Sequence, residues 1–392
     1  MIRKLAVILV ALSWLLGTEA LSARTAETGG KESTSSGSGL SASKSSTSKH
    51  TVKKKRTVRR ARSRRSRRRT WSPWRVSSYG DPGAEDNPDG DDPAVRQAAL
   101  DALGKWNGSV VVVDPNDGRI LTIVNQKLAL SSGFTPCSTF KPIVALAALR
   151  EGVITPTTKL RVGRRLKMNV TDALAHSNNA FFLKLGQMVG FDRLTHYARE
   201  FGLGQKAGLD IAGESPGQFP DEPPKQGGVG YLAYYGQDIQ VTPLQMAAMI
   251  SAIANGGTLY ELQYPRSPGE VAEFHPRVRR QLGDVASYIP EVREGLAAAV
   301  LYGTARSAYD PALSIFGKTG TCSEDGARLG WFVSYGGNEN PQYVVVVLLR
   351  GGRMMFGPHA AEIAGRLYRE LLQKEHLALT KREATSNGEI QP

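Results

Sequence analysis

Runs of apolar residues near both ends of the chain's long central part have the spacing of β-strands. Residues 109–114 and 119–124 are rich in β-branched side chains, and the turn signal Asn116-Asp117-Gly118 between them predicts a hairpin. Three further strand-like runs come late in the sequence, at residues 314–321, 329–335 and 343–349. Strands from both ends of the folded sequence are therefore expected to join in one sheet.

Between the two groups of strands, apolar residues recur at helical spacing. Helices are expected over residues 139–152, 177–188 and 243–254, and an amphipathic helix over residues 360–372 closes the pattern. No internal repeat is present. This order of strands and helices predicts an α/β fold.

Composition divides the chain into four parts. With 392 residues, of which 41% are hydrophobic, the chain can bury a sizeable core, expected over residues 93–375. Residues 24–92 are Ser- and Gly-rich, then basic, and acidic at their end, which predicts a disordered tether. Residues 376–392 are expected to form a flexible tail. Residues 1–23 form the fourth part, which differs from the rest by its apolar run.

The first 23 residues follow the pattern of a secretory signal peptide: a positive start, an apolar run from Leu5 to Gly17, and small residues from Ala20 to Ala23. The apolar run is shorter than the roughly 17–25 residues of a membrane-spanning helix. Cleavage is the favoured interpretation, and retention as a short membrane anchor is the alternative. Export to the periplasm or the outer face of the cytoplasmic membrane is therefore expected.

The formal net charge of +14 is concentrated in one segment. Residues 51–75 contain thirteen Lys and Arg, and the rest of the chain is close to neutral. The favoured interpretation of this run is a solvated linker, and the main alternative is contact with anionic envelope polymers or anionic lipid. Nucleic acid is not expected as a partner, because an exported chain seldom meets it.

Metal-ligand patterns are missing from the sequence. His176, His196, His275 and His359 lack the spacing of metal ligands, and neither a metal nor another cofactor is expected. The chain has two cysteines, and export would place them in an oxidising compartment where a disulfide can persist.

Three short motifs occur in order along the chain: Ser138-Thr139-Phe140-Lys141, Ser177-Asn178-Asn179, and Lys318-Thr319-Gly320-Thr321. In the first, a serine and a lysine three residues apart on a helix lie on one face. A lysine that burial or nearby cations keep neutral can take the proton of a serine hydroxyl, which makes Ser138 the candidate nucleophile and Lys141 its base. The start of the helix also favours the negative charge of acyl transfer.

The other two motifs supply groups that such a reaction needs. Ser177 can relay a proton to the leaving amine, and Asn179 can hold both Lys141 and a substrate amide. Lys318 on a strand offers a fixed positive charge for a substrate carboxylate, and Gly320 lets a substrate backbone come close. Hydroxyl donors come from Thr319 and Thr321, and the N–H groups of Ser138 and Thr321 are candidates for an oxyanion hole.

Context separates Ser138 from chance matches. Ser41 with Lys44 and Ser46 with Lys49 have the same Ser-x-x-Lys spacing, but they lie in the predicted tether with no helix after them. Ser138 has a predicted strand before it, a break at Pro136 and an apolar helix after it. Taken alone, Ser138 could equally be a helix N-cap. The three motifs in order favour an enzyme site.

At these residues the chain resembles the penicillin-recognising serine enzymes, whose motifs are Ser-x-x-Lys, Ser-x-Asn and Lys-Thr-Gly. It is most similar to the transpeptidase domain of class B penicillin-binding proteins, and the similarity covers most of residues 107–372. The stretches that carry it are PCSTFKPIVALAALREGVITP, SNNAFFLKLGQMVGFDRLTHYAREFGLG, GLDIAGESPGQFP, YGQDIQVTPLQMAAMISAIANGG and FGKTGTCSEDGARLGWFVSY.

The resemblance implies a mainly antiparallel sheet flanked by helices, an adjoining all-helical lobe, and an active site between them. It also implies a D,D-transpeptidase that is acylated at Ser138 by peptidoglycan stem peptides, releases D-alanine, and passes the acyl group to the amine of a neighbouring peptide. Acylation by β-lactams follows from the same resemblance.

Some features depart from the family pattern. A basic tether stands where class B proteins usually have a long pedestal domain, so an accessory transpeptidase, a D,D-carboxypeptidase and a β-lactamase-like hydrolase stay open. A deacylating hydrolase needs a glutamate that activates water, for which Glu200 and Glu214 are the nearest candidates. A penicillin-binding sensor that acylates without turnover is the alternative from a different class.

The two cysteines flank the same predicted cleft. Cys137 directly precedes Ser138, and Cys322 directly follows the third motif. If Ser138 and Thr321 share an oxyanion hole, their neighbours come close together. A Cys137–Cys322 disulfide is therefore predicted, similar to the bridge at the matching positions of some class A carbapenemases. Two buried free thiols are the alternative.

Overall fold

The computed structural model describes residues 73–337 and 340–388. The predicted signal or anchor at residues 1–23 and residues 24–72 of the predicted tether lie outside the described residues. None of the helices in the described ranges is both long and apolar enough to cross a bilayer. In chain order the elements are α1 (Pro93–Leu103), β1 (Gly108–Val113), β2 (Ile120–Val124), α2 (Gln126–Leu130), η1 (Cys137–Phe140), α3 (Lys141–Arg150), β3 (Leu160–Arg161), β4 (Lys167–Met168), α4 (Val170–Ala175), α5 (Asn179–Val189), α6 (Phe191–Glu200), α7 (Gly228–Tyr235), α8 (Pro243–Ala254), β5 (Thr258–Tyr260), α9 (Pro268–Ala272), β6 (Val278–Gln281), α10 (Gly283–Ala286), α11 (Ile289–Leu301), η2 (Arg306–Ala308), β7 (Ile315–Glu324), β8 (Ala327–Gly336), β9 (Tyr343–Gly351) and α12 (Gly357–Gly388).

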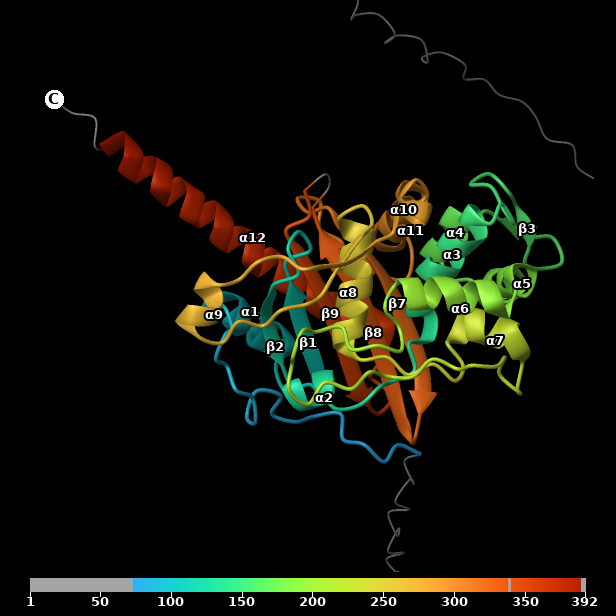
Figure 1. The fold of residues 1–392 in the computed structure, drawn as a ribbon, viewed down its shortest axis with the longest axis horizontal. Coiled ribbons are helices and arrows are strands. Elements are labelled where there is room, and N and C mark those ends of the chain that lie inside the picture. The colour runs from blue at the N-terminus through green and yellow to red at the C-terminus, as the bar shows by residue number, and fades with distance from the viewer. Residues whose placement is uncertain (1–72, 338–339, 389–392) are drawn as a thin grey trace, which may run out of the picture. The chain divides into compact units, whose positions relative to one another are not determined.

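Five strands form one antiparallel sheet in the order β2-β1-β9-β8-β7 (Figure 1). The early hairpin joins the three late strands through β1 and β9, where Val110 lies opposite Val347. The central strand β9 is buried on both faces from Val344 to Leu349, which explains its continuous apolar run. The predicted mainly antiparallel sheet, built from both ends of the folded sequence, is confirmed.

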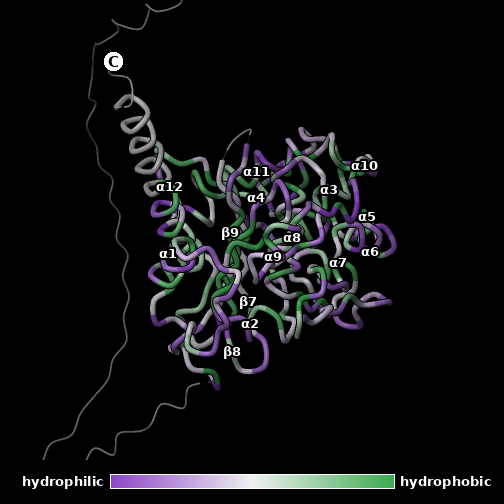
Figure 2. Tube along the Cα trace, turned by 60° about the vertical axis from the view of Figure 1, so that its left-hand side comes forward, coloured by the Kyte–Doolittle hydropathy of each residue, from purple (hydrophilic) through white to green (hydrophobic). Residues whose placement is uncertain are grey.

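Helices cover both faces of this sheet. Successive side chains of a strand point to opposite faces, so Val111 and Val113 join one hydrophobic core, and Val110 and Val112 join the other. Helix α8, buried at every position, packs against β1, β8 and β9 on the first face, and α1 and α12 cover the second. Figure 2 shows hydrophobic trace along β9, in the middle of the sheet. The flanking helices of the predicted fold class are present.

A lobe of helices lies beside the edge strand β7 (Figure 1). Within it α3 packs on α5 and α6, α5 packs on α7, and α4 packs on α11. Phe181, Phe182 and Leu185 of α5 are fully buried there. The short turn η1 contacts both β7 and α7 and so lies between the sheet and the lobe. The adjoining lobe implied by the family resemblance is confirmed, with the two-stranded hairpin β3–β4 as an addition to its helices.

Residues 73–92 differ from the disordered tether that was predicted for them. Arg75 donates its backbone N–H to the turn between β7 and β8. Asp86 and Asp91 form salt bridges with Arg96 of α1, and their side chains are 3% and 1% exposed. These carboxylates are therefore part of the folded domain, which begins earlier than predicted, because a cation on α1 compensates their burial.

The end of the domain also differs from the prediction. A flexible tail was expected over residues 376–392, but α12 continues to Gly388. The sequence after Leu372 is rich in Lys, Glu, Leu and Ala, which have high intrinsic helix propensity. Residues 389–392 lie outside the described residues.

Candidate active site

Ser138 and Lys141 stand where η1 meets α3. Ser138 is in the 3₁₀ turn η1 and Lys141 is the first residue of α3, so the predicted helical pair spans the junction of two helix types. Cys137, directly before Ser138, has a φ of 54°, in the left-handed region that non-glycine residues rarely adopt. Ser138 is partly exposed, and within the described part of the chain its hydroxyl has no hydrogen-bond partner. That hydroxyl is open to a substrate.

Lys141 reaches from α3 to the second motif. Its Nζ lies 2.8 Å from the carbonyl O of Ser177, 3.1 Å from Ser177 Oγ and 2.7 Å from Asn179 Oδ1. The ring of Phe182 lies on another side of Nζ, with its centroid 5.3 Å away. Lys141 is fully buried, and all of these neighbours are uncharged. The first two predicted motifs therefore meet at one nitrogen atom.

The surroundings of Lys141 favour its neutral form. Burial lowers the pKa of Lys141 well below the ordinary value of lysine, and the charge of Lys318 lowers it further. A neutral amine has two N–H donors and one lone pair. The Ser177 carbonyl and Asn179 Oδ1 can only accept, so they engage the two N–H groups. In the neutral form the lone pair is left for the third polar neighbour, Ser177 Oγ at 3.1 Å, an arrangement in which the amine can act as a base.

Ser177 occupies a tight turn between α4 and α5. Its φ is 52°, and backbone hydrogen bonds to the last turn of α4 close the turn. Asn178 caps α5 by accepting a backbone N–H with its side chain, which leaves Asn179, the first helical residue, to hold Lys141. A non-glycine residue in the left-handed region is a strained feature of the kind that clusters at functional sites.

Lys318 lies in β7 with its side chain fully buried. Its Nζ donates to the carbonyl O of Thr319 at 3.1 Å. Burial lowers the pKa of Lys318 to about 7, because a lysine without solvent contact is less stable in its charged form. The positive charge predicted at Lys318 stays a prediction.

The free edge of β7 carries the remaining residues of the third motif. In an antiparallel strand the N–H and C=O of one residue point to the same side, and the side alternates along the strand. The Ser323 carbonyl points off the sheet, because it accepts from the Tyr235 hydroxyl of α7 at 3.2 Å. Thr321 and Thr319, two and four residues earlier, therefore also present N–H and C=O groups at this edge. The Thr321 N–H is not used by the sheet.

Gly320 has a different neighbour from the one predicted. A Cβ at this position would lie 3.0 Å from Pro136 O and 3.1 Å from Thr139 Cγ2. The missing side chain therefore makes room for η1, whereas the prediction assigned that room to a substrate backbone. The close approach brings the turn that carries Ser138 against the strand that carries Thr321.

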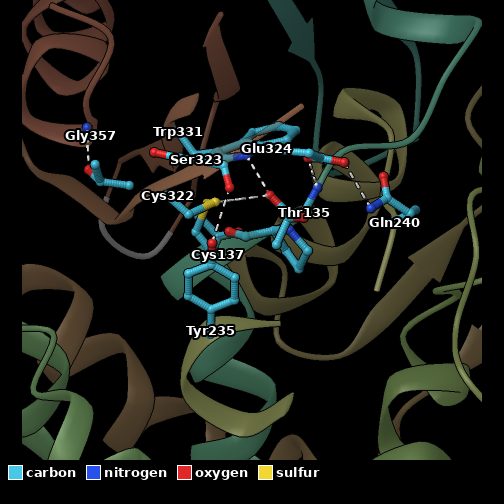
Figure 3. Close-up of a disulfide and its surroundings, with 12 residues drawn as sticks. Thr135, Cys137, Tyr235, Gln240, Cys322, Ser323, Glu324, Trp331 and Gly357 are labelled. Carbon is cyan, nitrogen blue, oxygen red and sulfur yellow. Dashed lines mark hydrogen bonds between the residues drawn. A yellow bond between two sulfur atoms is a disulfide. The ribbon is translucent and has the colours of Figure 1, made fainter. Parts of the chain in front are cut away.

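A disulfide fixes this contact covalently. Cys137 and Cys322, the predicted pair, are bonded with a Cα–Cα distance of 5.7 Å (Figure 3). Thr135, two residues before Cys137, accepts from Trp331 Nε1 at 3.0 Å and donates its N–H to Glu324 at 2.9 Å. Strands β7 and β8 thus hold the segment before Ser138 from several sides, and the nucleophile and Thr321 each neighbour a bridged cysteine.

Sequence reasoning missed Thr304. Thr304, after α11, donates its N–H to the carbonyl at the end of α4, and its Oγ1 lies 2.6 Å from Thr319 Oγ1. No motif marks it, and only the fold brings it to β7. The two glutamates considered for water activation are engaged elsewhere: Glu214 accepts from backbone N–H groups in its own loop, and Glu200 pairs with Arg280.

Comparison with known proteins identifies related chains. The family model described as penicillin binding protein transpeptidase domain matches residues 108–372. Stage V sporulation protein D of Bacillus subtilis is 30% identical over 316 residues, which cover 69% of this chain and 48% of that protein. The peptidoglycan D,D-transpeptidase MrdA of Haemophilus influenzae is 24% identical, over 69% of this chain and 54% of that protein. The chain thus spans about half the length of the curated relatives it matches.

Solved structures share the fold. The transpeptidase domain of Burkholderia pseudomallei penicillin-binding protein 3 superposes with a TM-score of 0.63 at 21% identity, covering 75% of this chain and 97% of that one.

Proposed function

The chain belongs to the penicillin binding protein transpeptidase domain family, and on that premise we propose that it is a serine D,D-transpeptidase acylated at Ser138. Its acyl donors are peptidoglycan stem peptides, and β-lactams acylate the same hydroxyl. The relatives named as peptidoglycan D,D-transpeptidases support this reaction class. The product is a cross-link between two stem peptides.

The first half of the reaction forms the acyl-enzyme. Lys141 accepts the proton of the Ser138 hydroxyl as Ser138 Oγ attacks the carbonyl carbon of the terminal peptide bond of the donor. The N–H groups of Ser138 and Thr321 stabilise the oxyanion. As the C–N bond breaks, Ser177 passes a proton to the departing amine of D-alanine and takes one from Lys141, to which it is hydrogen-bonded at 3.1 Å.

The second half transfers the acyl group. The amine of a neighbouring peptide enters where D-alanine left, loses a proton through Ser177 and Lys141, and attacks the ester carbon. The C–O bond breaks and Ser138 regains its proton. The hydroxyl groups of Thr319 and Thr321 bind the carboxylate of the donor, and Lys318, in its charged form, adds positive potential behind them.

One observation carries this proposal: Lys141 is buried three residues after Ser138 and is hydrogen-bonded to both Ser177 and Asn179, and its burial lowers its pKa well below the ordinary value of lysine. A buried amine whose N–H groups are occupied by carbonyl oxygens serves poorly as a structural cation. Its lone pair is suited to moving protons between two hydroxyl groups.

Labelling with a fluorescent penicillin tests the proposal. The wild-type chain is expected to carry one adduct, mapped by mass spectrometry to Ser138, and Ser138→Ala is expected to carry none. Failure of the wild type to label, or an adduct at another residue, would refute the acyl-enzyme.

Incubation with a stem-peptide donor, with and without an acceptor amine, then separates the related activities. A cross-linked product supports transfer. Release of D-alanine alone favours a D,D-carboxypeptidase, rapid loss of the penicillin adduct favours a β-lactamase-like hydrolase, and a stable adduct without peptide turnover favours a sensor. We further propose that the protein acts outside the cytoplasm. Contact between the basic run and anionic envelope polymers stays a prediction.

A further inference from the structure

Thr304 connects the two walls of the active site. Its backbone N–H donates to the carbonyl O of Ala175 at 3.0 Å, one residue before the turn that carries Ser177. Its Oγ1 lies 2.6 Å from Oγ1 of Thr319 in β7. One residue outside the three motifs therefore joins the end of α4, two residues before Ser177, to Thr319 of the third motif through two hydrogen bonds.

The packing around Thr304 leaves little freedom in this connection. A Cβ at Gly303 would lie 2.1 Å from the Ala175 carbonyl O, so only glycine permits the backbone approach. On the other side, a Cβ at Gly357 would lie 2.7 Å from Thr319 Cβ. Thr319 is 4% exposed and is held between Thr304 and the start of α12. The orientation of its hydroxyl is therefore restricted by its neighbours.

The proton arrangement of the two threonines decides what Thr319 can do. Each hydroxyl has a single proton to donate. If Thr319 donates to Thr304, it has no proton for a substrate carboxylate and presents only an acceptor oxygen to it. If Thr304 donates to Thr319, the Thr319 proton is available, and the chain of two hydroxyl groups strengthens its bond to an anion.

We propose that Thr304 is a positioning residue that sets specificity for a free carboxylate on the acyl donor: its hydroxyl donates to Thr319 Oγ1 and so directs the Thr319 proton to that carboxylate. This inference rests on the proposed function, because it concerns how the same site recognises its donor. It predicts that Thr304 acts on donors with a charged carboxylate and hardly at all on donors in which that group is esterified.

Acylation rates with a penicillin and with the methyl ester of the same penicillin test this inference. In Thr304→Val the backbone bond to Ala175 is kept and only the hydroxyl is lost. The second-order rate constant for the free acid is expected to fall about tenfold, the effect of one hydrogen bond to a charged group, and that for the ester by less than about twofold. Thr304→Ser, which keeps a hydroxyl, is expected to retain most of the wild-type preference.

Two further variants distinguish a positioning role of Thr304 from a general loss of structure. Thr258→Val removes a hydroxyl that bonds to Gln281 Oε1 between β5 and β6, and it is expected to leave the acid-to-ester ratio unchanged. In a Thr319→Val background, Thr304→Val is expected to have no further effect on that ratio, because the Thr319 hydroxyl through which Thr304 acts is already absent.

The outcomes are distinguishable from a failure of the proposed function. If the wild type labels normally and Thr304→Val keeps its acid-to-ester ratio, or loses both rates equally, this inference alone is overturned. Failure of Thr304→Ser to retain the preference also overturns it. If the wild type does not label at all, the proposed function is refuted and this inference with it.

Discussion

Two buried groups of charged residues in this domain are built in opposite ways. In the first, Arg96 of α1 contacts Asp91 at 2.6 Å and Asp86 at 3.1 Å, and the three side chains are 13%, 1% and 3% exposed. The Tyr264 hydroxyl also donates to Asp91. Each charge has an opposite charge or a donor beside it. This group joins the segment before α1 to the rest of the fold.

The second group is the proposed catalytic pocket, where Lys141 and Lys318 are both fully buried. Neither ammonium has a carboxylate partner within the described part of the chain, and the acceptors around Lys141 are neutral. Burial lowers the pKa of both lysines, and Lys318 lowers that of Lys141 further. Arg96 and its carboxylates are each compensated by a partner, whereas the two buried lysines are not, and burial without a counter-charge is what lowers their pKa values toward those of a base.

The largest expected effect comes from removing the catalytic amine. Lys141→Met keeps the length of the side chain and loses the base, so penicillin acylation is expected to fall by about 10³-fold or more. The free energy of unfolding is expected to fall by no more than about 1 kcal/mol, because replacing an uncompensated buried ionisable group with an apolar one is close to neutral. Stopped-flow labelling and urea unfolding measure the two effects.

Arg96→Met is the matched change in the compensated group. It leaves Asp86 and Asp91 buried without their cation, and the free energy of unfolding is expected to fall by about 3 kcal/mol. At a temperature where the variant is folded, acylation of Ser138 is expected to be near the wild-type rate. If Arg96→Met were stable and inactive while Lys141→Met were active and unstable, the division between the two groups would be wrong.

The next prediction concerns the disulfide. It is a covalent link beside a pocket whose two buried lysines have no ion pair within the described residues. The double variant Cys137→Ser, Cys322→Ser is expected to lose about 5 kcal/mol of unfolding free energy or less, since the bridge closes a loop with a sequence separation of 185 residues. Acylation is expected to slow several-fold as η1 loosens against β7. A reducing agent should produce the same changes in the wild type and none in the double variant; equal effects on both would argue against the bridge.

Much of the fold was predictable because it depends on local pattern. The strands predicted at residues 329–335 and 343–349 are contained in β8 and β9, since a run that is apolar on both faces fits only a central strand. The helix after Ser138 was predictable from its apolar spacing and its glycine stop. The three motifs could be found because their residue types have few other reasons to occur in that order.

What could not be predicted depends on partners far away in the sequence. Asp86 and Asp91 have the composition of a solvated loop, and only contact with Arg96 buries them. The lowered pKa of Lys318 follows from its burial, which the sequence does not show, and Thr304 has no local signal at all. Gly320 was identified for a close approach, but the approaching group is η1. Tertiary contacts therefore decide these assignments.

The smallest expected effect is a pH dependence that sharpens the comparison between the two charge groups. The pKa of Lys318 is about 7 in the folded chain and near 10.5 when unfolded. Between these values the unfolded state binds a proton that the folded state does not, so unfolding free energy rises with pH, by up to about 1.4 kcal/mol per pH unit for one such lysine. Burial raises the pKa of Asp91, so its contribution has the opposite sign and lies in acid. Urea unfolding at pH 7, 8 and 9 is expected to show that the free energy of unfolding rises more steeply with pH in the wild type than in Lys318→Met. If unfolding free energy rose equally with pH in the wild type and in Lys318→Met, Lys318 would have an ordinary pKa. Lys141 would then be the one lysine of the proposed pocket with a lowered pKa.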